Sequence, residues 1–259
     1  MGIDRRKFMK IAGISALGIG GAAQPVSRLL GQEAEGVLEK SPPLHAKRWA
    51  MVIDLKKCHE EGDCTSCIDA CNKVHNVPDF DSPKDEVKWI WKESFRHAFH
   101  DQGGEYMRED LAHGPVMLLC NHCDNPPCVR VCPTQATWKR DEDGIVMMDW
   151  HRCIGCRYCV AACPYGSRSF NWRDPRPHIE EVDENYPTRT RGVVEKCTFC
   201  EERLAKGQLP ACVEACEKKA IVFGDLEDPE SEVRELLAEK FAIRRKPGLG
   251  TAPEVYYLV

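Results

Sequence analysis

The chain has 259 residues, a formal net charge of −5 and sixteen cysteines. This length fits one large domain or two small ones. The sequence has no basic stripe interleaved with aromatic residues, which argues against a nucleic-acid-binding protein. Because aromatic residues make up only 8% of the chain, we expect a small apolar core. Bound metal would then supply much of the folding free energy, so the metal-free chain should be poorly folded.

The amino terminus has the pattern of an export signal. Arg5 and Arg6 are followed by Phe8 and then by thirteen small and apolar residues at 11–23. The pattern is similar to a twin-arginine (Tat) signal; a general secretory signal and a chance basic start are alternatives. At ~1.5 Å per residue the apolar run is shorter than a ~30 Å hydrocarbon core. We expect an exported protein, in the periplasm or on the outer face of the cytoplasmic membrane, with residues 1–23 cleaved or retained as an anchor.

The cysteines fall into four quartets, and none is left over. The third quartet has the spacing C-x2-C-x2-C-x3-C followed by proline, and the fourth has the longer spacing C-x2-C-x11-C-x3-C. Three closely spaced thiolates can hold three irons of one [4Fe–4S] cluster, while the fourth thiolate reaches a neighbouring cluster. The quartets are Cys58, Cys64, Cys67 and Cys71; Cys120, Cys123, Cys128 and Cys132; Cys153, Cys156, Cys159 and Cys163; and Cys197, Cys200, Cys212 and Cys216.

This spacing predicts four [4Fe–4S] clusters held by exchange of the last cysteine between paired quartets. The second and third quartets would form an inner two-cluster module, and the first and fourth an outer module that the inner one interrupts. The predicted ligand sets are Cys120, Cys123, Cys128 and Cys163; Cys153, Cys156, Cys159 and Cys132; Cys58, Cys64, Cys67 and Cys216; and Cys197, Cys200, Cys212 and Cys71.

Three other uses of the cysteines remain open from the sequence. A disulfide framework suits an exported protein, but it gives no reason for three closely spaced thiols in each quartet. Four cysteines can bind zinc, and the fourth quartet alone has a suitable spacing. One of the four sites could also hold a three-iron cluster.

Local patterns predict a hairpin and a helix. Asp143-Gly144 separates the apolar runs 137–138 and 145–148, which is typical of a hairpin turn. Near the carboxyl end, Asp228 is a candidate helix cap and Pro229 suits the first turn. The apolar residues that we expect on the buried face of this helix are Val233, Leu236, Leu237 and Phe241.

Residues 72–119 separate the first and second quartets and predict one or two amphipathic helical turns. This segment is either a lid that shields a cluster from water or a docking surface for a haem or membrane partner. Its aromatic residues and histidines are Trp89, Trp91, Phe95, His97, Phe99, His100 and His113.

Two sets of polar residues have an open role. One set, beside or near the cysteines, would either donate hydrogen bonds to cluster sulfur and raise its potential or be ordinary polar neighbours: His59, His122 and His151. The second set consists of arginines in the proline-rich loop 166–196. We expect these charges to be solvated; the alternatives are that they offset cluster charge or bind an acidic partner. The arginines are Arg173, Arg176, Arg189 and Arg191.

Over residues 47–259 the quartet spacing resembles the sixteen-cysteine iron–sulfur subunits of the dimethyl sulfoxide reductase family. Segments 220–229 and 250–258 are part of the same resemblance. It implies an α+β fold of two intertwined bacterial-ferredoxin-like modules with short hairpins, short helices and long loops. Such subunits pass electrons between a partner redox centre and the membrane, and many pair with a quinone-interacting integral membrane subunit of the NrfD type.

The first quartet points to one branch of that family. Five residues separate Cys58 from Cys64, where most members have two, and residues 67–78 look like the periplasmic DsrO-type subunit of the sulfite-reduction-associated Dsr membrane complex. This closer resemblance implies a multihaem cytochrome c and further Dsr-type subunits as partners, in sulfur metabolism. The wide gap makes the geometry of the first cluster irregular.

The sequence shows no nucleophile–base pair and no phosphate-binding loop, so we expect an electron-transfer subunit without catalytic residues. The alternatives are the iron–sulfur subunit of an exported molybdopterin oxidoreductase, a soluble ferredoxin acting alone and, in another class, a zinc-bound structural or adaptor protein. The expected parts are 1–23, signal; 24–46, linker; 47–71 and 192–228, outer module; 72–119, insertion; 120–165, inner module; 166–191, connecting loop; and 229–259, C-terminal helix and tail.

Overall fold

The computed structural model describes residues 41–60, 64–104 and 106–259. The predicted signal and most of the predicted linker lie outside these ranges. Within them, short helices and small sheets alternate along the chain, which confirms the predicted α+β class. No helix in the described ranges is long and apolar enough to cross a membrane.

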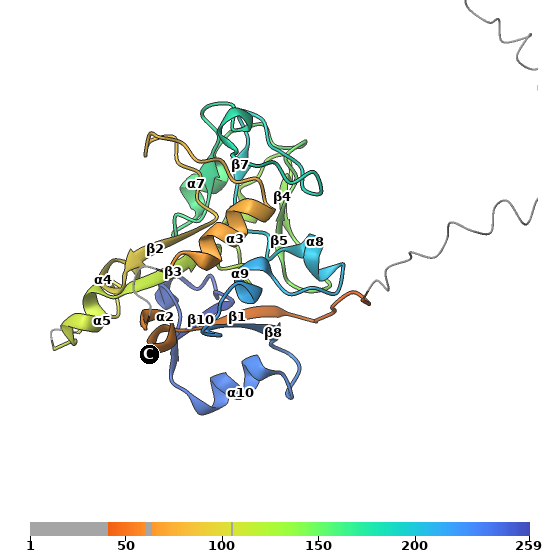
Figure 1. Ribbon diagram of the computed structural model, residues 1–259. Coiled ribbons are helices and arrows are strands. Elements are labelled where there is room, and N and C mark those ends of the chain that lie inside the picture. Colours follow the sequence, from red (N-terminus) through yellow and green to blue (C-terminus); the bar gives the residue numbers. More distant parts are fainter. Residues whose placement is uncertain (1–40, 61–63, 105) are drawn as a thin grey trace, which may run out of the picture. The chain divides into compact units, whose positions relative to one another are not determined.

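The largest sheet has four strands in the order β8-β1-β10-β9. Its central strand β1 (Trp49–Asp54) pairs antiparallel with β8 (Ile221–Asp225) and parallel with β10 (Val255–Leu258). Strand β9 (Ala242–Ile243) completes the edge. The sheet and helix α10 (Glu232–Glu239) occupy the lower part of Figure 1, so both ends of the described chain contribute to one layer.

Three antiparallel strand pairs carry the rest of the fold. The predicted hairpin at Asp143-Gly144 is confirmed, with β4 and β5 on its two sides and Gly144 at φ +77°. A positive φ is accessible to glycine without steric cost, so the residue suits the turn. The pairs are β2 (Ile90–Ser94) with β3 (Pro115–Leu119), β4 (Thr137–Lys139) with β5 (Val146–Met148), and β6 (Ser169–Phe170) with β7 (Val194–Glu195).

The remaining helices are short, and many lie next to cysteines. Helix α3 packs against α9, and α6 packs against α7. Such short helices depend on tertiary packing for their stability. Their bounds are α2 Leu55–His59, α3 Ser66–Val74, α4 Phe95–Ala98, α5 Glu109–His113, α6 Pro127–Arg130, α7 Tyr158–Ala162, α8 Glu201–Leu204 and α9 Ala211–Glu214, with 3-10 turns η2 Arg176–His178 and η3 Pro247–Leu249.

The one or two helical turns predicted within residues 72–119 are present as α4 and α5, but the aromatic run that begins at Trp89 starts as a strand. Residues Ile90–Ser94 form strand β2, and within this run only Phe95–Ala98 is helical, as α4. The run Trp89-Ile90-Trp91 consists of aromatic and β-branched residues, which favour a strand when a partner is available, and β3 supplies that partner. Trp89 is buried, as a lid would require.

The C-terminal helix is confirmed, but its ends differ from the prediction. Ser231 caps α10, because its hydroxyl accepts the N–H of the third helical residue at 3.3 Å, whereas Asp228 accepts a main-chain N–H in the preceding turn. Val233 is fully buried against the four-stranded sheet. The helix ends at Glu239, so Phe241 lies beyond it and is 75% exposed.

The apolar core is larger than the composition predicts. One contiguous cluster joins 28 buried residues from the four-stranded sheet, β3, α4 and the cysteine loops. Cysteines themselves are part of it, since a buried thiol packs as a small apolar side chain. The cysteines in this core are Cys71, Cys120, Cys197 and Cys212.

Candidate iron–sulfur centres

All sixteen cysteines lie in the described ranges and are free thiols, so no disulfide framework is present in this part of the chain. Two cavities, the thiol charges around Cys71 and one apolar cluster bring together three complete predicted ligand sets and, of the fourth, Cys132, Cys153 and Cys159. Cys156 belongs to the fourth set by the sequence prediction. We name the four sets site I (Cys58, Cys64, Cys67 and Cys216), site II (Cys71, Cys197, Cys200 and Cys212), site III (Cys120, Cys123, Cys128 and Cys163) and site IV (Cys132, Cys153, Cys156 and Cys159).

Two of the groups line cavities. The four cysteines of site I line one cavity, and the four cysteines of site III line another. Cys58 lies in α2 and Cys64 lies before α3, so the widened first gap still brings both to the same cavity. Each cavity is lined by one predicted ligand set, with the last cysteine supplied by the paired quartet. The ligand assignment itself stays a prediction.

The cysteines of site II lie close enough together to affect the pKa of Cys71. The pKa of Cys71 is raised well above its ordinary value, first by burial and then by Cys200, Cys197 and Cys212. Cys71 lies in α3 and Cys212 in α9, and these two helices pack together. Packing of helices from the first and fourth quartets therefore brings this group together.

Site IV is built around α6, α7 and the β4–β5 hairpin. Cys159 is buried in a small apolar cluster against which Cys132 and Cys153 pack. Burial opposes ionisation of Cys132, but N–H groups of Thr137 and Thr134 outweigh burial and lower its pKa. Main-chain donors thus stabilise a thiolate at this position before any metal is considered.

The same sharp turn recurs in three quartets. The residue directly before the second cysteine has a positive φ in each: His122 (φ 41°), Gly155 (φ 69°) and Phe199 (φ 57°). In site IV a Cβ at position 155 would overlap the main-chain oxygen of Gly192. This repeated turn curls each C-x2-C segment around one point, which is the shape that three thiolates of one cluster need.

Two observations show that these residues fit iron–sulfur clusters: main-chain N–H groups donate to cysteine sulfur, and one buried side-chain amide has no hydrogen-bond partner. Main-chain N–H groups approach Cys197, Cys200 and Cys216 at 3.3–3.4 Å. Asn121 lines the site III cavity and is 1% exposed, yet neither its amide nitrogen nor its amide oxygen has a partner in the described chain. A buried polar group without a partner is costly, so a ligand with acceptor atoms would satisfy the amide nitrogen.

The thiols also need compensating cations. Burial, followed by the charges of neighbouring thiols, raises the pKa of Cys67 to about 12 and keeps Cys123 and Cys212 above their ordinary pKa. Several thiolates at such close range are stable only beside a strong positive charge, and a coordinated metal removes the thiol proton outright. The grouped cysteine thiols are therefore suitable ligands for iron.

Cysteines of one site affect the thiol pKa of cysteines in the next, which places the sites in the order I, II, III, IV. In each pair burial is the largest influence on the thiol pKa, and a cysteine of the adjacent site contributes further. The connecting pairs are Cys67 and Cys212 for I and II, Cys120 and Cys197 for II and III, and Cys128 and Cys159 for III and IV.

The burial of the cysteines also differs between the middle sites and the end sites. Every cysteine of site II and three of the four in site III are buried, whereas all of site I and three of the four in site IV are partly exposed. In this order, two buried sites lie between two sites that are partly exposed.

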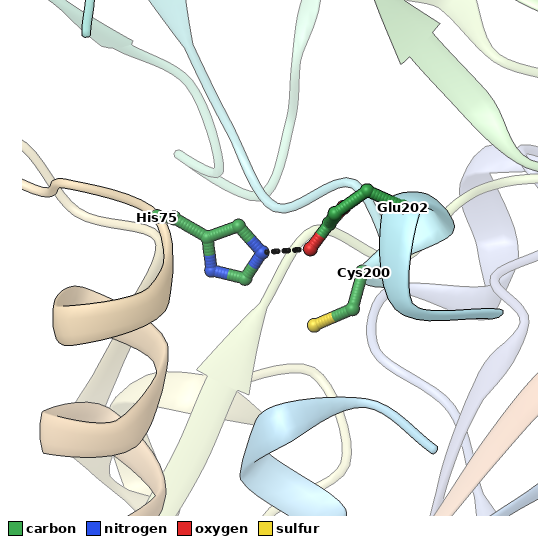
Figure 2. A group of neighbouring side chains, drawn as sticks. All are labelled: His75, Cys200 and Glu202. Atoms are coloured by element: carbon green, nitrogen blue, oxygen red, sulfur yellow. Dashed lines mark hydrogen bonds and ion pairs between the residues drawn. The ribbon is translucent and has the colours of Figure 1, made fainter. Parts of the chain in front are cut away.

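A buried histidine beside site II was missed by sequence reasoning. Figure 2 shows His75 directed from the end of α3 toward Glu202 at the start of α8, with Cys200 beside them. His75 Nδ1 lies 2.9 Å from the carbonyl oxygen of Cys71 and 3.4 Å from its Sγ, and Nε2 lies 3.0 Å from Glu202 Oε1. Both ring nitrogens therefore face acceptor atoms, those of Cys71 on one side and the Glu202 carboxylate on the other.

Two buried cations near the cysteines were also missed. Arg168 Nη2 donates to Cys128 Sγ at 3.1 Å, and the Lys196 ammonium donates to the carbonyl oxygens of Val146 and Cys197. Burial lowers the pKa of Lys196, while neighbouring thiol charges act in the opposite direction. The only sequence signal was a cation a few residues from a quartet, and most such cations are exposed.

The three predicted sulfur-tuning histidines differ. His59 Nε2 faces the Pro115 carbonyl oxygen at 2.8 Å, and His151 is exposed. His122 is buried, and its Nδ1 accepts the Val146 N–H at 3.1 Å. Burial and then Lys196 lower the pKa of His122, so the ring is neutral and Nε2 carries a proton. Only His122 therefore has a donor suited to a tuning role, which stays a prediction.

The insertion and the connecting loop hold the remaining candidates. His97, His100 and His113 are exposed, and neither the lid nor the docking hypothesis is tested by their positions. In the connecting loop, the expectation of solvated charges is wrong for Arg189. Its side chain is fully buried and pairs with Glu195 at 2.6 Å, because the loop folds back over the end of α3.

Comparisons with known proteins agree with this geometry. A family model described as a 4Fe-4S dicluster domain matches residues 116–177 and 182–226. With the sixteen cysteines, this match supports the predicted four [4Fe–4S] clusters, so a zinc-bound structural protein is not supported.

The relatives match four fifths or more of the chain. The chain is 41% identical to the Hdr-like menaquinol oxidoreductase iron-sulfur subunit 1 of Archaeoglobus fulgidus, over 98% of this chain and 97% of that protein. It is 38% identical to an iron-sulfur subunit of Halobacterium salinarum that is named for dimethyl sulfoxide reductase (81% and 78%). It is 39% identical to the menaquinone reductase iron-sulfur cluster-binding subunit of Nitratidesulfovibrio vulgaris (82% and 88%). The chain therefore belongs to the family of ferredoxin-type 4Fe–4S subunits that transfer electrons in respiratory oxidoreductase complexes.

Proposed function

We propose that this chain relays electrons between a quinone-reactive, NrfD-type membrane subunit and another redox subunit of a respiratory membrane complex. The order of the four cysteine sites carries the proposal, because the buried middle sites are flanked by two partly exposed ends. Bound clusters would supply one-electron storage at each site. The chain's own residues hold the thiolates, donate N–H groups to sulfur and exclude water from sites II and III.

The site IV end has the composition of a permanent interface. Of the ten large apolar side chains that are exposed in the described chain, five lie within a few residues of the site IV cysteines or pack beside them. Arg157 lies over the ring of Trp172 at 4.6 Å, which holds an aromatic face beside the site. We assign this end to the apolar membrane subunit, since exposed apolar patches mark interaction surfaces. The five side chains are Val131, Trp138, Ile154, Tyr158 and Trp172.

The site I end is different, because lysines surround its cavity. Lys57, Lys92 and Lys218 line it together with the four cysteines. A basic rim favours encounter with an acidic partner through electrostatic steering. We assign this end to a second redox subunit, such as a multihaem cytochrome c or a further Dsr-type subunit.

The names of the relatives support a quinone-linked complex. Two of them are named for menaquinol or menaquinone, so we propose a quinone of that class as the ultimate redox partner. The widened first quartet and residues 67–78 favour a DsrO-type subunit in sulfur metabolism. The sequence of residues 1–23 favours Tat export and a periplasmic location, with the chain peripheral to the membrane or held by its signal.

A second candidate is the iron–sulfur subunit of an exported molybdopterin oxidoreductase. It is favoured by the relative named for dimethyl sulfoxide reductase. The two functions use the same four sites and differ in the subunit that meets one end of the path.

Purification of the tagged chain from detergent-solubilised membranes tests the proposal. We expect an integral membrane subunit and a haem protein to copurify, and menaquinol to reduce the clusters in that complex. Recovery of a molybdopterin protein instead would favour the second candidate. Recovery of the chain alone, with its iron intact, would contradict both.

A matched pair of variants tests the assignment of the site IV end. Trp172 is 48% exposed and is not adjacent to a cysteine, whereas Phe241 is 75% exposed beyond α10. Trp172→Glu should lose the membrane subunit while it keeps the iron content, and Phe241→Glu should keep both. Normal copurification of Trp172→Glu would show that this face is not the interface.

A further inference from the structure

Arg168 lies inside the protein at the junction of sites III and IV. The residue is 5% exposed, and its guanidinium donates to Cys128 Sγ (3.1 Å) and to Thr137 Oγ1 (2.8 Å), with Met148 Sδ at 3.8 Å. The thiol charges that reach it come from both sites, namely Cys128, Cys120 and Cys163 of site III and Cys159 of site IV. Its strongest contact is therefore to a cysteine of site III.

The charge of Arg168 has no carboxylate counterpart. Among the described residues, its side-chain partners are the thiols of Cys128 and Cys159, a hydroxyl and a thioether. Arginine stays ionised in proteins, and a buried cation without an anionic partner is strongly destabilising. The anion that balances Arg168 is therefore the four-thiolate group of site III with its cluster.

Site II also has a buried cation nearby, Lys196, but its ammonium donates to the carbonyl oxygens of Val146 and Cys197 and not to sulfur. His75 Nε2 lies 3.0 Å from Glu202 Oε1, as Figure 2 shows, so the histidine beside Cys71 and Cys200 has a carboxylate next to it. At site I, Lys57 is exposed and Lys92 is half-buried in the cavity lining, and at site IV Arg157 is exposed, so water screens these cations more than it screens Arg168. Site III thus has a buried positive charge in direct contact with sulfur that no carboxylate offsets.

The buried positive charge at site III matters when that site is reduced. With a cluster held by the four cysteines of site III, reduction by one electron from a neighbouring site would add one negative charge to the cluster, and no bond or proton would change. A fixed positive charge stabilises that added charge, and donors to sulfur act in the same direction. The orphaned amide of Asn121 lines the same cavity and is a second candidate donor.

We propose that Arg168 sets the potential of site III and makes it the first of the four sites to be reduced. This inference rests on the proposed electron relay and on the predicted ligand set of site III. Electrons that enter from either end would then collect at site III before they move on, so the path has a storage point one step from the site IV end.

Redox titration of the purified complex, followed by electron paramagnetic resonance, tests the proposal. In Arg168→Gln, which keeps an N–H donor without the charge, the component reduced first should lose at least tenfold in its ratio of reduced to oxidised cluster. That factor corresponds to 59 mV for one electron. Arg168→Lys should recover most of the shift, because it restores the charge. Arg130→Gln, an exposed arginine two residues from Cys128, should leave every component in place.

The outcomes are separable from failure of the proposed function. Iron and sulfide content below four clusters in the native complex would contradict the relay itself. Four intact clusters with no shift in Arg168→Gln would overturn the role of Arg168. If Arg168→Gln does not assemble, native complex labelled with guanidino-15N arginine gives the answer. The component reduced first should then show a coupled guanidinium nitrogen, and the absence of that coupling would overturn the proposal.

Discussion

Replacement of Glu195 by glutamine should destabilise the fold by about 3–5 kcal/mol, because Arg189 would remain charged and unpaired in the core. The two side chains are fully buried, with Arg189 Nη2 2.6 Å from Glu195 Oε2. Glutamine retains an oxygen for the indole N–H of Trp89, which donates to this carboxylate at 2.9 Å. The substitution therefore removes the charge and keeps the hydrogen bond from Trp89, while the hydrogen bond from the Asn171 amide to the other carboxylate oxygen is lost.

Anaerobic urea unfolding, monitored by cluster absorbance and circular dichroism, measures the effect. With a slope of ~3 kcal/mol per M, the midpoint should fall by about 1 M or more. The control is Asp174→Asn, which breaks the exposed pair of Asp174 with Arg176 in the same loop. Exposed pairs contribute about 1 kcal/mol or less, so the control should shift little. Equal shifts in the two variants would refute the reasoning.

Two further predictions concern the cysteine sites. Gly155→Ala should lose the site IV cluster, because the added Cβ would overlap the main-chain oxygen of Gly192. The measurement is the iron content per chain. The control is Gly166→Ala, which has a similar φ of +68° but lies in open space and should keep four clusters. Burial raises the pKa of Cys67 and Cys197 to about 12, so these thiols are protonated at pH 7 and iron binding must release their protons. Anaerobic cluster reconstitution, followed by absorbance, should therefore become more favourable from pH 7 to pH 9, and a flat profile would contradict this sign.

Cysteine spacing predicted much of the site because the chemistry is local. A C-x2-C segment fixes a tight turn and a short distance between thiolates, and the structure repeats that turn at His122, Gly155 and Phe199. The hairpin at Gly144 was predictable for the same reason, since two adjacent residues determine the turn. These features depend on residues that are close in sequence.

The features that sequence reasoning missed depend on long-range packing. Arg168 contacts Cys128, which is 40 positions away, and His75 contacts Glu202, which is 127 positions away. Residues 90–94 became a strand because β3 lies beside them, not because of their own periodicity. The composition gave no indication that Arg189 would be buried, because charged residues in a proline-rich loop are usually solvated.

Two of the buried arginines, Arg168 and Arg189, differ in what balances their charge, and this difference predicts how metal removal acts. Glu195 balances Arg189 whether or not clusters are bound, whereas Arg168 has only sulfur and hydroxyl partners in the described chain. Metal removal therefore leaves Arg168 as an uncompensated buried cation, which costs about 3–5 kcal/mol in other proteins. Part of the coupling between cluster binding and folding would arise at this single side chain.

The corresponding experiment compares the chain with and without iron. Arg168→Gln should make the iron-free chain more resistant to urea than the iron-free native chain, because the unpaired cation is gone. The same substitution should destabilise the iron-loaded protein, where the cluster balances the charge. Because the two forms are expected to respond with opposite signs, general damage to packing cannot produce the result. A loss of stability in both forms would show that Arg168 acts only through packing.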